Sequence, residues 1–212
     1  MGLILGVTPA RGGSKGIPRK NLQPCCGKPL MTWTIEAAKS SKLLDRYVVS
    51  TEDAEIANVA RRSGAEVIRR PSELATDEAT TLSVLQHVLT QVPADLVVVL
   101  QATSPVRDEG LIDRCIRQVL DTGADSLATG FICTYVEYGT NRQELNRQAI
   151  PGFFYDDGNV YIVKAELLRR GERFGTRMER VVLDREQNVD VDEGFDFWLA
   201  EQVLAKRHRV AA

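Results

Sequence analysis

The sequence predicts an α/β domain in which a mostly parallel sheet is flanked by helices. Short apolar runs rich in β-branched residues alternate with segments of helical periodicity, and this alternation is typical of a parallel sheet. The run LVVVL is apolar on both faces, as expected of a central strand that helices cover on both sides.

The expected elements follow one another in a regular order up to residue 131. Strands are expected at 3–7, 47–50, 66–69, 96–101 and 125–131. Helices are expected between them, at 30–41, 53–63, 80–91 and 109–122. Gly64 and Gly123 stand directly after two of these helical patterns, where a glycine commonly ends a helix.

The regular alternation stops after about residue 131. The segment FFYDDGNVYIV predicts a strand around Asp157 and Gly158, the segment QNVDVD predicts a last short strand, and residues 193–206 predict an amphipathic helix. We therefore expect one domain over residues 1–212 with a short inserted arm at about 132–158.

Composition excludes several classes of protein. The 212 residues carry a formal net charge of −2, which argues against a general nucleic-acid binder. No apolar run approaches the roughly 20 residues that a membrane span needs, and the start of the chain lacks a basic leader. None of the four cysteines stands in a C-x-x-C pair, so we expect free thiols, no zinc site and a cytoplasmic location; these are Cys25, Cys26, Cys115 and Cys133.

A basic, glycine-rich loop follows the first expected strand. It reads PARGGSKGIPRK over residues 9–20, and its cations are Arg11, Lys15, Arg19 and Lys20. Ligands of open α/β sheets bind beyond the carboxyl ends of the strands, where this loop begins. Glycines let the backbone approach a ligand closely, so backbone N–H groups and cations together predict a cradle for phosphates. The alternative is a solvated basic loop. The spacing fits neither G-x-G-x-x-G nor the P-loop, which disfavours a dinucleotide-binding dehydrogenase and a P-loop NTPase.

Two carboxylates lie two residues apart near the end of the chain. If NVDVD forms a strand, Asp190 and Asp192 point to one face and can together hold a hard cation such as Mg²⁺. The alternative is a polar strand edge followed by a helix N-cap at Asp192.

Several motifs in order carry a resemblance to a known family. The segments ARGGSKGIPRKNL, VVSTED, RRPSELATDEATT, LQATSPVR and NVDVD resemble the CMP-sialic acid synthetases, or acylneuraminate cytidylyltransferases, over about residues 1–130 and 155–205. The resemblance implies a Rossmann-like nucleotidyltransferase fold and an enzyme that uses CTP and Mg²⁺. It also implies a homodimer formed through the arm.

The resemblance assigns residues to the nucleotide and to catalysis. It implies that CTP is held by Ala10, Arg11, Gly12, Gly13, Ser14, Lys15, Lys20, Asn21, Arg70, Ala79, Thr80, Thr81 and Gln101. An acceptor oxygen would attack the α-phosphorus while pyrophosphate leaves in line. Arg11, Lys15 and Lys20 would stabilise the leaving group, and Mg²⁺ on Asp190 and Asp192 would neutralise the α-phosphate.

The acceptor half departs from the family pattern. The resemblance implies an acceptor site that includes Gln101, Thr103, Ser104, Arg147 and Tyr161. Residues 132–146 contain no lysine, whereas the family supplies one from a longer arm, and the family's Asn-Gly is Asp157-Gly158 here. We therefore expect the acceptor to be either a small phosphonate or a nonulosonic, sialic-type sugar acid.

Two other functions remain open at this point. One is another sugar-nucleotide pyrophosphorylase, for example of the 3-deoxy-octulosonate type. The other is a nucleotide-binding regulatory protein without turnover, which the intact pair of aspartates argues against. The apolar segment FICTYVEY would either form a dimer interface or cover the acceptor site.

Overall fold

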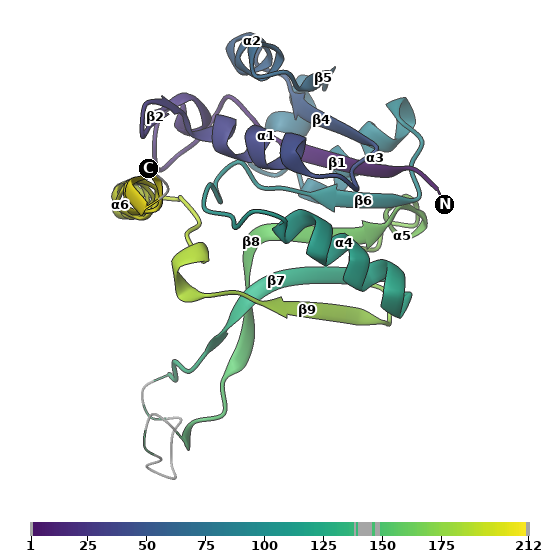
Figure 1. Ribbon diagram of the computed structural model, residues 1–212. Helices are drawn as coiled ribbons and strands as arrows, with labels where there is room; N and C mark the ends of the chain where they lie inside the picture. Colours follow the sequence, from purple (N-terminus) through teal and green to yellow (C-terminus); the bar gives the residue numbers. More distant parts are fainter. Residues whose placement is uncertain (1, 138, 140–145, 147–148, 211–212) are drawn as a thin grey trace.

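A seven-stranded mixed sheet forms the centre of the computed structural model, which describes residues 2–137, 139, 146 and 149–210 (Figure 1). Its strands, in chain order, are β1 (Ile4–Pro9), β4 (Arg46–Thr51), β5 (Glu66–Arg69), β6 (Leu96–Val99), β7 (Ser126–Cys133), β8 (Phe153–Lys164) and β9 (Met178–Val182). They are arranged in the order β5-β4-β1-β6-β8-β7-β9. Within the described part of this sheet only β8 runs against its neighbours, so the prediction of a mostly parallel sheet is confirmed.

Helices cover both faces of the sheet. The helices are α1 (Leu30–Ser40), α2 (Ala54–Arg62), α3 (Thr81–Gln91), α4 (Leu111–Thr122), α5 (Ala165–Arg169) and α6 (Gly194–Val210). Apolar residues of α1, α2 and α4 pack against one face, and those of α3 and α5 pack against the other. The central strand β6 is buried along its whole length between these layers, as its uninterrupted apolar sequence predicts.

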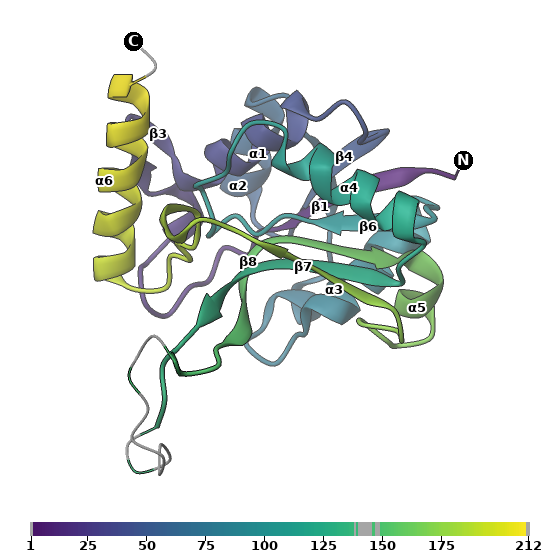
Figure 2. The ribbon, with the colours of Figure 1, turned by 60° about the horizontal axis from the view of Figure 1, so that its bottom comes forward.

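The last helix lies apart from the other helices, beside a small hairpin. Figure 2 shows α6 standing at one side of the molecule. It packs on the hairpin of β2 (Pro24–Cys25) and β3 (Lys28–Pro29) through a cluster that includes Cys25, Leu30 and Leu204. All four cysteines are free thiols, in agreement with the prediction. No helix within the described ranges is long and apolar enough to cross a membrane.

Two sequence expectations are wrong near the C-terminus. The predicted strand at 187–192 is absent: Gln187 ends the short 3₁₀ helix η4 (Arg185–Gln187), and residues 188–192 follow it without regular secondary structure. Val191 N–H donates to the carbonyl of Thr103 at 2.8 Å. Buried and exposed side chains nevertheless alternate in this segment, as they would in a strand: Val189 and Val191 are buried, and Asp190 and Asp192 face outwards. The edge position next to β7 is taken by β9, which the sequence analysis did not identify, nor did it identify α5.

The arm is a ribbon made by the ends of β7 and β8. The pairs Gly130–Asp156 to Cys133–Phe153 continue the two strands beyond the other strands of the sheet (Figure 1). An irregularity separates this ribbon from the main sheet, since Ala128 pairs with Tyr161 whereas Gly130 pairs with Asp156. Thr129 alone therefore stands opposite the four residues 157–160 of β8. This bulge turns Asp157 and Gly158 away from regular pairing.

Candidate active site

The basic loop leaves β1 at the edge of the sheet where β4, β5 and β6 also end, as the parallel arrangement requires. Two hydrogen bonds hold the backbone of the loop. Ala10 N–H donates to the carbonyl of Ser50, and Gly12 N–H donates to the carboxylate of Glu52 at 2.6 Å. A Cβ at Gly12 would lie 2.6 Å from the carboxylate of Asp53, and one at Gly16 would lie 2.2 Å from the carbonyl oxygen of Asp192. Both glycines are therefore required by close packing rather than by a left-handed conformation.

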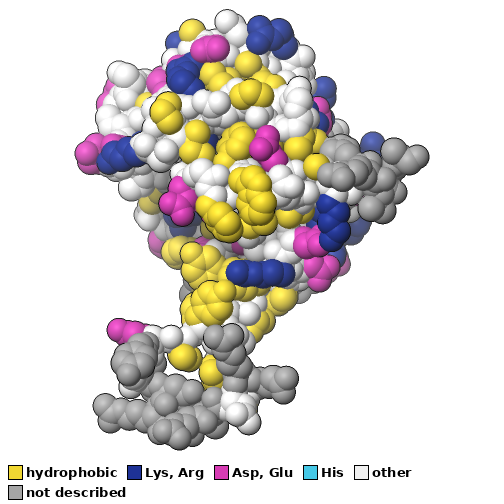
Figure 3. Space-filling view, turned by 90° about the vertical axis from the view of Figure 1, so that its left-hand side faces the viewer, with side chains coloured by type: hydrophobic (Ala, Val, Ile, Leu, Met, Phe, Trp, Pro, Cys, Tyr) yellow, Lys and Arg dark blue, Asp and Glu magenta, His cyan; other side chains and the backbone are white. Residues whose placement is uncertain are grey.

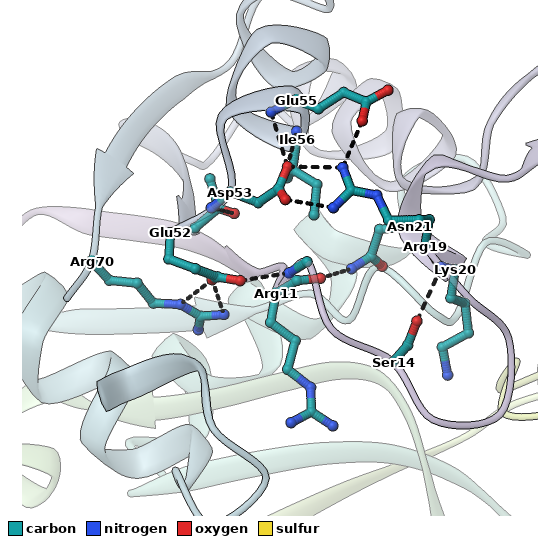
Figure 4. A network of polar contacts seen from close by, with 12 residues as sticks. Arg11, Ser14, Arg19, Lys20, Asn21, Glu52, Asp53, Glu55, Ile56 and Arg70 are labelled. Atoms are coloured by element: carbon teal, nitrogen blue, oxygen red, sulfur yellow. Dashed lines mark hydrogen bonds and ion pairs between the residues drawn. The ribbon is translucent and has the colours of Figure 1, made fainter. Parts of the chain in front are cut away.

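Glu52 connects the loop to a buried arginine. Its second carboxylate oxygen accepts two hydrogen bonds at 3.1 Å from Nε and Nη2 of Arg70, which follows β5 and is 7% exposed (Figure 4). Burial lowers the pKa of Arg70 and the charge of Glu52 opposes that shift, as expected for a desolvated ion pair. One carboxylate thus fixes both the loop backbone and the guanidinium of Arg70.

Arg19 points away from the cavity and anchors the loop to α2. It adopts a left-handed backbone conformation with φ of 56°, and its guanidinium binds Asp53 at 2.5 and 3.1 Å and Glu55 at 2.6 Å (Figure 4). Asp53 is also the N-cap of α2, where its side chain accepts the N–H groups of Glu55 and Ile56. Of the four loop cations, Arg19 therefore has a structural role.

Lys20 joins the loop to the carboxylate pair. Its ammonium group lies 2.9 Å from the carboxylate of Asp192 and 2.5 Å from the carbonyl oxygen of Val191, and its side chain is only 12% exposed. The hydroxyl of Ser14 accepts the N–H of Lys20 and donates to the carbonyl of Ile17, so it shapes the turn that precedes Lys20.

A cavity of about 460 Å³ lies against this loop. Most of the residues that the sequence analysis assigned to the nucleotide line it, namely Arg11, Gly13, Ser14, Lys15, Lys20, Asn21, Arg70, Ala79, Thr81 and Gln101. Asn21 also donates its amide to the carbonyl of Arg11, which holds the loop in place. Ala10, Gly12 and Thr80 lie outside the lining, and Thr80 is the N-cap of α3.

Two cations in this cavity share one carboxylate. Arg11 and Lys15 bind Asp77 at 2.7 and 2.8 Å, and they lower its pKa. Asp77 is exposed, and it comes from the segment between η2 (Ser72–Ala75) and α3, on the opposite wall of the cavity. An anionic ligand that enters the cavity would replace Asp77 as the partner of both cations.

A second cavity, of about 550 Å³, adjoins the first and shares Gln101, Thr103 and Asp192 with it. It is also lined by Tyr161, whose hydroxyl donates to Asp156 at 2.9 Å, and by Asp190. Ser104 is fully buried with its hydroxyl 3.4 Å from the carbonyl of Asp157, so the structure does not bring it to the cavity. Arg147 lies outside the described residues.

Asp192 lines both cavities, and Asp190 lines the second one. Desolvation by the cavity walls raises the pKa of Asp190, and the charge of Asp192 raises it further, so the two carboxylates lie close enough to interact. Among the described residues, no three or more Asp, Glu, His or Cys side chains are grouped so that they could enclose a metal ion. Two carboxylates fit Mg²⁺, which usually keeps several waters and binds substrate phosphates in place of further protein ligands.

The sequence analysis missed three acidic residues of this site. Glu52, Asp53 and Asp77 each bind a loop residue, and none of them was assigned a role. A signal was present, because the acidic pair of STED follows the strand that neighbours the basic loop. Carboxylates at the end of an adjacent parallel strand are the natural partners of cations on that loop.

Comparison with known proteins places the chain in a family. The family described as "Cytidylyltransferase" matches residues 5–151. The chain is 29% identical to the N-acylneuraminate cytidylyltransferase of Escherichia coli O18:K1:H7 (strain RS218 / NMEC), over 97% of this chain and 53% of the relative. It is 33% identical to N-acylneuraminate cytidylyltransferase A of Danio rerio, over 91% of this chain and 49% of the relative. The chain thus spans about half the length of these two curated relatives.

Other relatives match over nearly their whole length. A CMP-N,N'-diacetyllegionaminic acid synthase of Legionella pneumophila is 29% identical over 95% of this chain and 96% of the relative. Among solved structures, a CMP:2-keto-3-deoxy-manno-octonic acid synthetase complexed with CTP superposes with a TM-score of 0.75 at 16% identity, over 97% of this chain and 99% of that one. At this identity the superposition concerns the fold alone, and it agrees with the predicted Rossmann-like architecture.

The ion pair of Arg19 with Asp53 predicts a pH-dependent stability. We expect Arg19→Ala to lower the free energy of unfolding by about 1 kcal/mol at neutral pH, because a bidentate, part-exposed pair is lost. Alanine keeps the left-handed backbone cost unchanged, since it also carries a Cβ. The arginine lowers the pKa of Asp53, so this stabilisation is present above the ordinary carboxyl pKa of about 4 and is lost as the pH falls through the lowered value.

Urea unfolding of the wild type and the variant, at neutral and at acidic pH, measures this difference. Arg62→Ala, an exposed arginine at the end of α2, is the control and should change stability little. A loss that is equally large at both pH values would contradict the proposed linkage.

Proposed function

The chain belongs to the cytidylyltransferase family, and we propose that it transfers CMP from CTP to an anionic acceptor with release of pyrophosphate. The observation that carries this proposal is the contact of Lys20 with Asp192, 2.9 Å apart in space and 172 residues apart in sequence. This contact joins the basic loop, which lines the first cavity, to the segment of Asp190 and Asp192; Asp192 lines both cavities and Asp190 lines the second. Cations and a carboxylate pair side by side suit the activation of a nucleoside triphosphate.

The first cavity is assigned to CTP. The triphosphate lies along the loop, where Arg11 and Lys15 exchange Asp77 for phosphate oxygens and Lys20 contacts the phosphates near Asp192. The cytidine lies towards Arg70, Ala79 and Thr81, on the wall formed by the end of β5 and the start of α3. Glu52 holds Arg70 in place for this contact.

The reaction is an in-line displacement at the α-phosphorus. An oxygen of the acceptor forms a new bond to the α-phosphorus, and the bond from that phosphorus to the oxygen bridging the α- and β-phosphates breaks, so pyrophosphate leaves with the electron pair. Arg11, Lys15 and Lys20 stabilise the charge that grows on the leaving group. Mg²⁺ held by Asp190 and Asp192 supplies charge neutralisation at the α-phosphate.

The acceptor occupies the second cavity. Gln101 and Thr103 line both cavities and are therefore placed to contact the acceptor next to the α-phosphate, and Tyr161 lies further inside. Arg147 remains a candidate for the acceptor anion. The names of the relatives favour a nonulosonic sugar acid as the acceptor class. A small phosphonate is the second candidate, favoured by the absence of lysine from residues 132–146.

We further propose a homodimer formed by one domain, residues 1–212, through its arm at about 132–158. Exposed apolar side chains gather there: Ile132, Tyr135, Phe153 and Tyr155 are each at least 51% exposed. Figure 3 shows apolar side chains continuing from the body of the molecule onto the arm. A second copy that covers this face would remove them from water. The free thiols favour a cytoplasmic location for the enzyme.

Choice of nucleotide tests the proposal directly. Pyrophosphate release is measured with CTP, UTP, ATP and GTP, with Mg²⁺ and a panel of sugar acids and phosphonates. We expect release with CTP, at a kcat/KM about 10-fold or more above that for the other nucleotides, because the small residues Ala79 and Thr81 leave room suited to a pyrimidine and the polar groups of Arg70 and Thr81 can distinguish cytosine from uracil. Binding of CTP without release from any acceptor would instead indicate a regulatory protein.

Two substitutions test the junction of the cavities. We expect Lys20→Ala and Asp190→Ala each to lower kcat by on the order of 10² or more, the scale of one lost transition-state charge contact. The controls are Lys28→Ala and Asp121→Ala, which change the same residue types outside both cavities and should leave kcat within twofold. Near-normal kcat in both site variants would rule out these roles.

The dimer is tested by light scattering. We expect Phe153→Asp to shift the protein from dimer to monomer, because a charge in a buried apolar contact is strongly unfavourable. Leu120→Asp, on the exposed side of α4, is the control and should leave the dimer intact. A monomeric wild type would contradict this interface.

A further inference from the structure

The second cavity is strongly acidic for a site that receives an anion. Its lining contains the five aspartates Asp156, Asp157, Asp190, Asp192 and Asp196, and none of its lining residues in the described chain is a lysine or an arginine. The remaining lining residues are Gln101, Thr103, Tyr155, Gly158 and Tyr161. An acceptor that carries only negative charge would meet repulsion from these carboxylates.

Most of these carboxylates already have partners. Asp190 and Asp192 are assigned to Mg²⁺, and Asp192 also binds Lys20. Asp196 accepts the N–H groups of Asp192 and Glu193 at the start of α6. Asp156 accepts the hydroxyl of Tyr161.

Asp157 is the exception, because only one of its two carboxylate oxygens has hydrogen-bond partners among the described residues. It is 6% exposed, and one of its oxygens accepts the hydroxyl of Thr129 at 2.7 Å and the N–H of Asn159 at 3.0 Å. The other oxygen, Oδ2, is buried and has no hydrogen-bond partner among the described residues. A buried carboxylate oxygen without a donor is costly, so this atom indicates a missing ligand group.

The described cation whose charge acts on Asp157 is Arg107, and its guanidinium is directed elsewhere. Arg107 is buried and its charge acts on Asp157, but its guanidinium donates to the carbonyls of Gln101 and Asn159 and to the hydroxyl of Thr34. It does not line the second cavity. No donor among the described residues completes Oδ2 of Asp157, so a hydrogen-bond donor carried by the ligand is the group that suits this atom.

We propose that the acceptor is a zwitterion, which carries a protonated amine in addition to its nucleophilic anionic end, and that Asp157 binds this ammonium group. The inference rests on the proposed cytidylyltransferase activity and names the class of its acceptor. An alkyl ammonium group is fully protonated at neutral pH, donates up to three hydrogen bonds and offsets the charge of the aspartates. Tyr155 and Tyr161 in the same lining add aromatic rings, which also favour a cation.

Two sources have this chemistry: an aminoalkylphosphonate and an amino sugar acid. Each is tested with a matched pair of compounds that differ in a single amine-for-hydroxyl exchange. The first pair is aminoethylphosphonate and hydroxyethylphosphonate. The second is N-acetylneuraminic acid and its derivative with an amine in place of the terminal hydroxyl. Pyrophosphate release with CTP and Mg²⁺ gives kcat/KM for all four compounds.

For the wild type we expect the amine to exceed its hydroxyl counterpart by about 10- to 100-fold in one pair, the range of a charge-assisted hydrogen bond. The pair that shows this preference identifies the source. A hydroxyl compound that equals or exceeds its amine in both pairs would overturn the inference while leaving the cytidylyltransferase activity standing. No release from any of the four compounds would overturn that activity and the inference together.

Asp157→Asn assigns the effect to this side chain. Asparagine keeps the size and the hydrogen bonds at the Oδ1 position but removes the charge. We expect kcat/KM for the amine to fall by about 10- to 100-fold and kcat/KM for the hydroxyl counterpart to stay within twofold. Asp121→Asn, an exposed aspartate of α4, is the matched control and should change neither value. Equal effects of Asp157→Asn on both compounds, or none on either, would refute the role of Asp157. The wild-type comparison decides the acceptor class even where the variant folds poorly.

Discussion

The contacts of the Glu52 carboxylate are the interaction on which the shape of the first cavity depends. This carboxylate lies between two neighbouring strand ends, and it holds the loop backbone at Gly12 with one oxygen and Arg70 with the other. The glycine-rich loop has little intrinsic preference for one conformation, so its shape has to be imposed by contacts from outside. Glu52 imposes it on one side and the pair of Arg19 with Asp53 imposes it on the other. The remaining cations of the loop are thereby left facing the cavity.

Those cations are balanced by acids before any ligand is bound. Asp77 serves Arg11 and Lys15, and Asp192 serves Lys20. If a phosphate oxygen took the place of Asp77, the freed carboxylate would remain hydrated, because its side chain is 42% exposed, and this limits the desolvation cost of the exchange. The same balance explains why a loop with four cations occurs in a chain whose formal net charge is −2.

Local patterns in the sequence predicted most of the fold, and most of the residues that the resemblance assigned to CTP line the first cavity. The helices over 30–41, 53–63, 80–91 and 109–122 were found because their apolar periodicity and stop signals are encoded locally. The segment NVDVD shows the limit of such patterns: alternation reports which side chains are buried, but a strand also needs a neighbour with free backbone groups, and β9 holds that position. The roles of Glu52 and Asp77, and the outward turn of Arg19, depend on contacts between distant segments. Spacing along the chain does not show which cation each acid binds; only the place of Glu52 after the strand next to the loop pointed to such a contact.

The bulge in β8 separates the arm from the part of the strand in the main sheet, so that the pairing register of one does not determine that of the other. Thr129 fixes the bulge, because its hydroxyl donates to Asp157 and accepts the N–H of Val160 at 2.9 Å. In an unbroken ladder, inserting one residue in the arm would shift the register and turn every side chain of the cavity wall to the opposite face. Here residues 157–160 absorb such a shift before it reaches the strand that begins again at Tyr161. The arm can therefore lengthen, shorten or change its sequence during evolution while the regular part of the strand from Tyr161 onwards keeps its geometry.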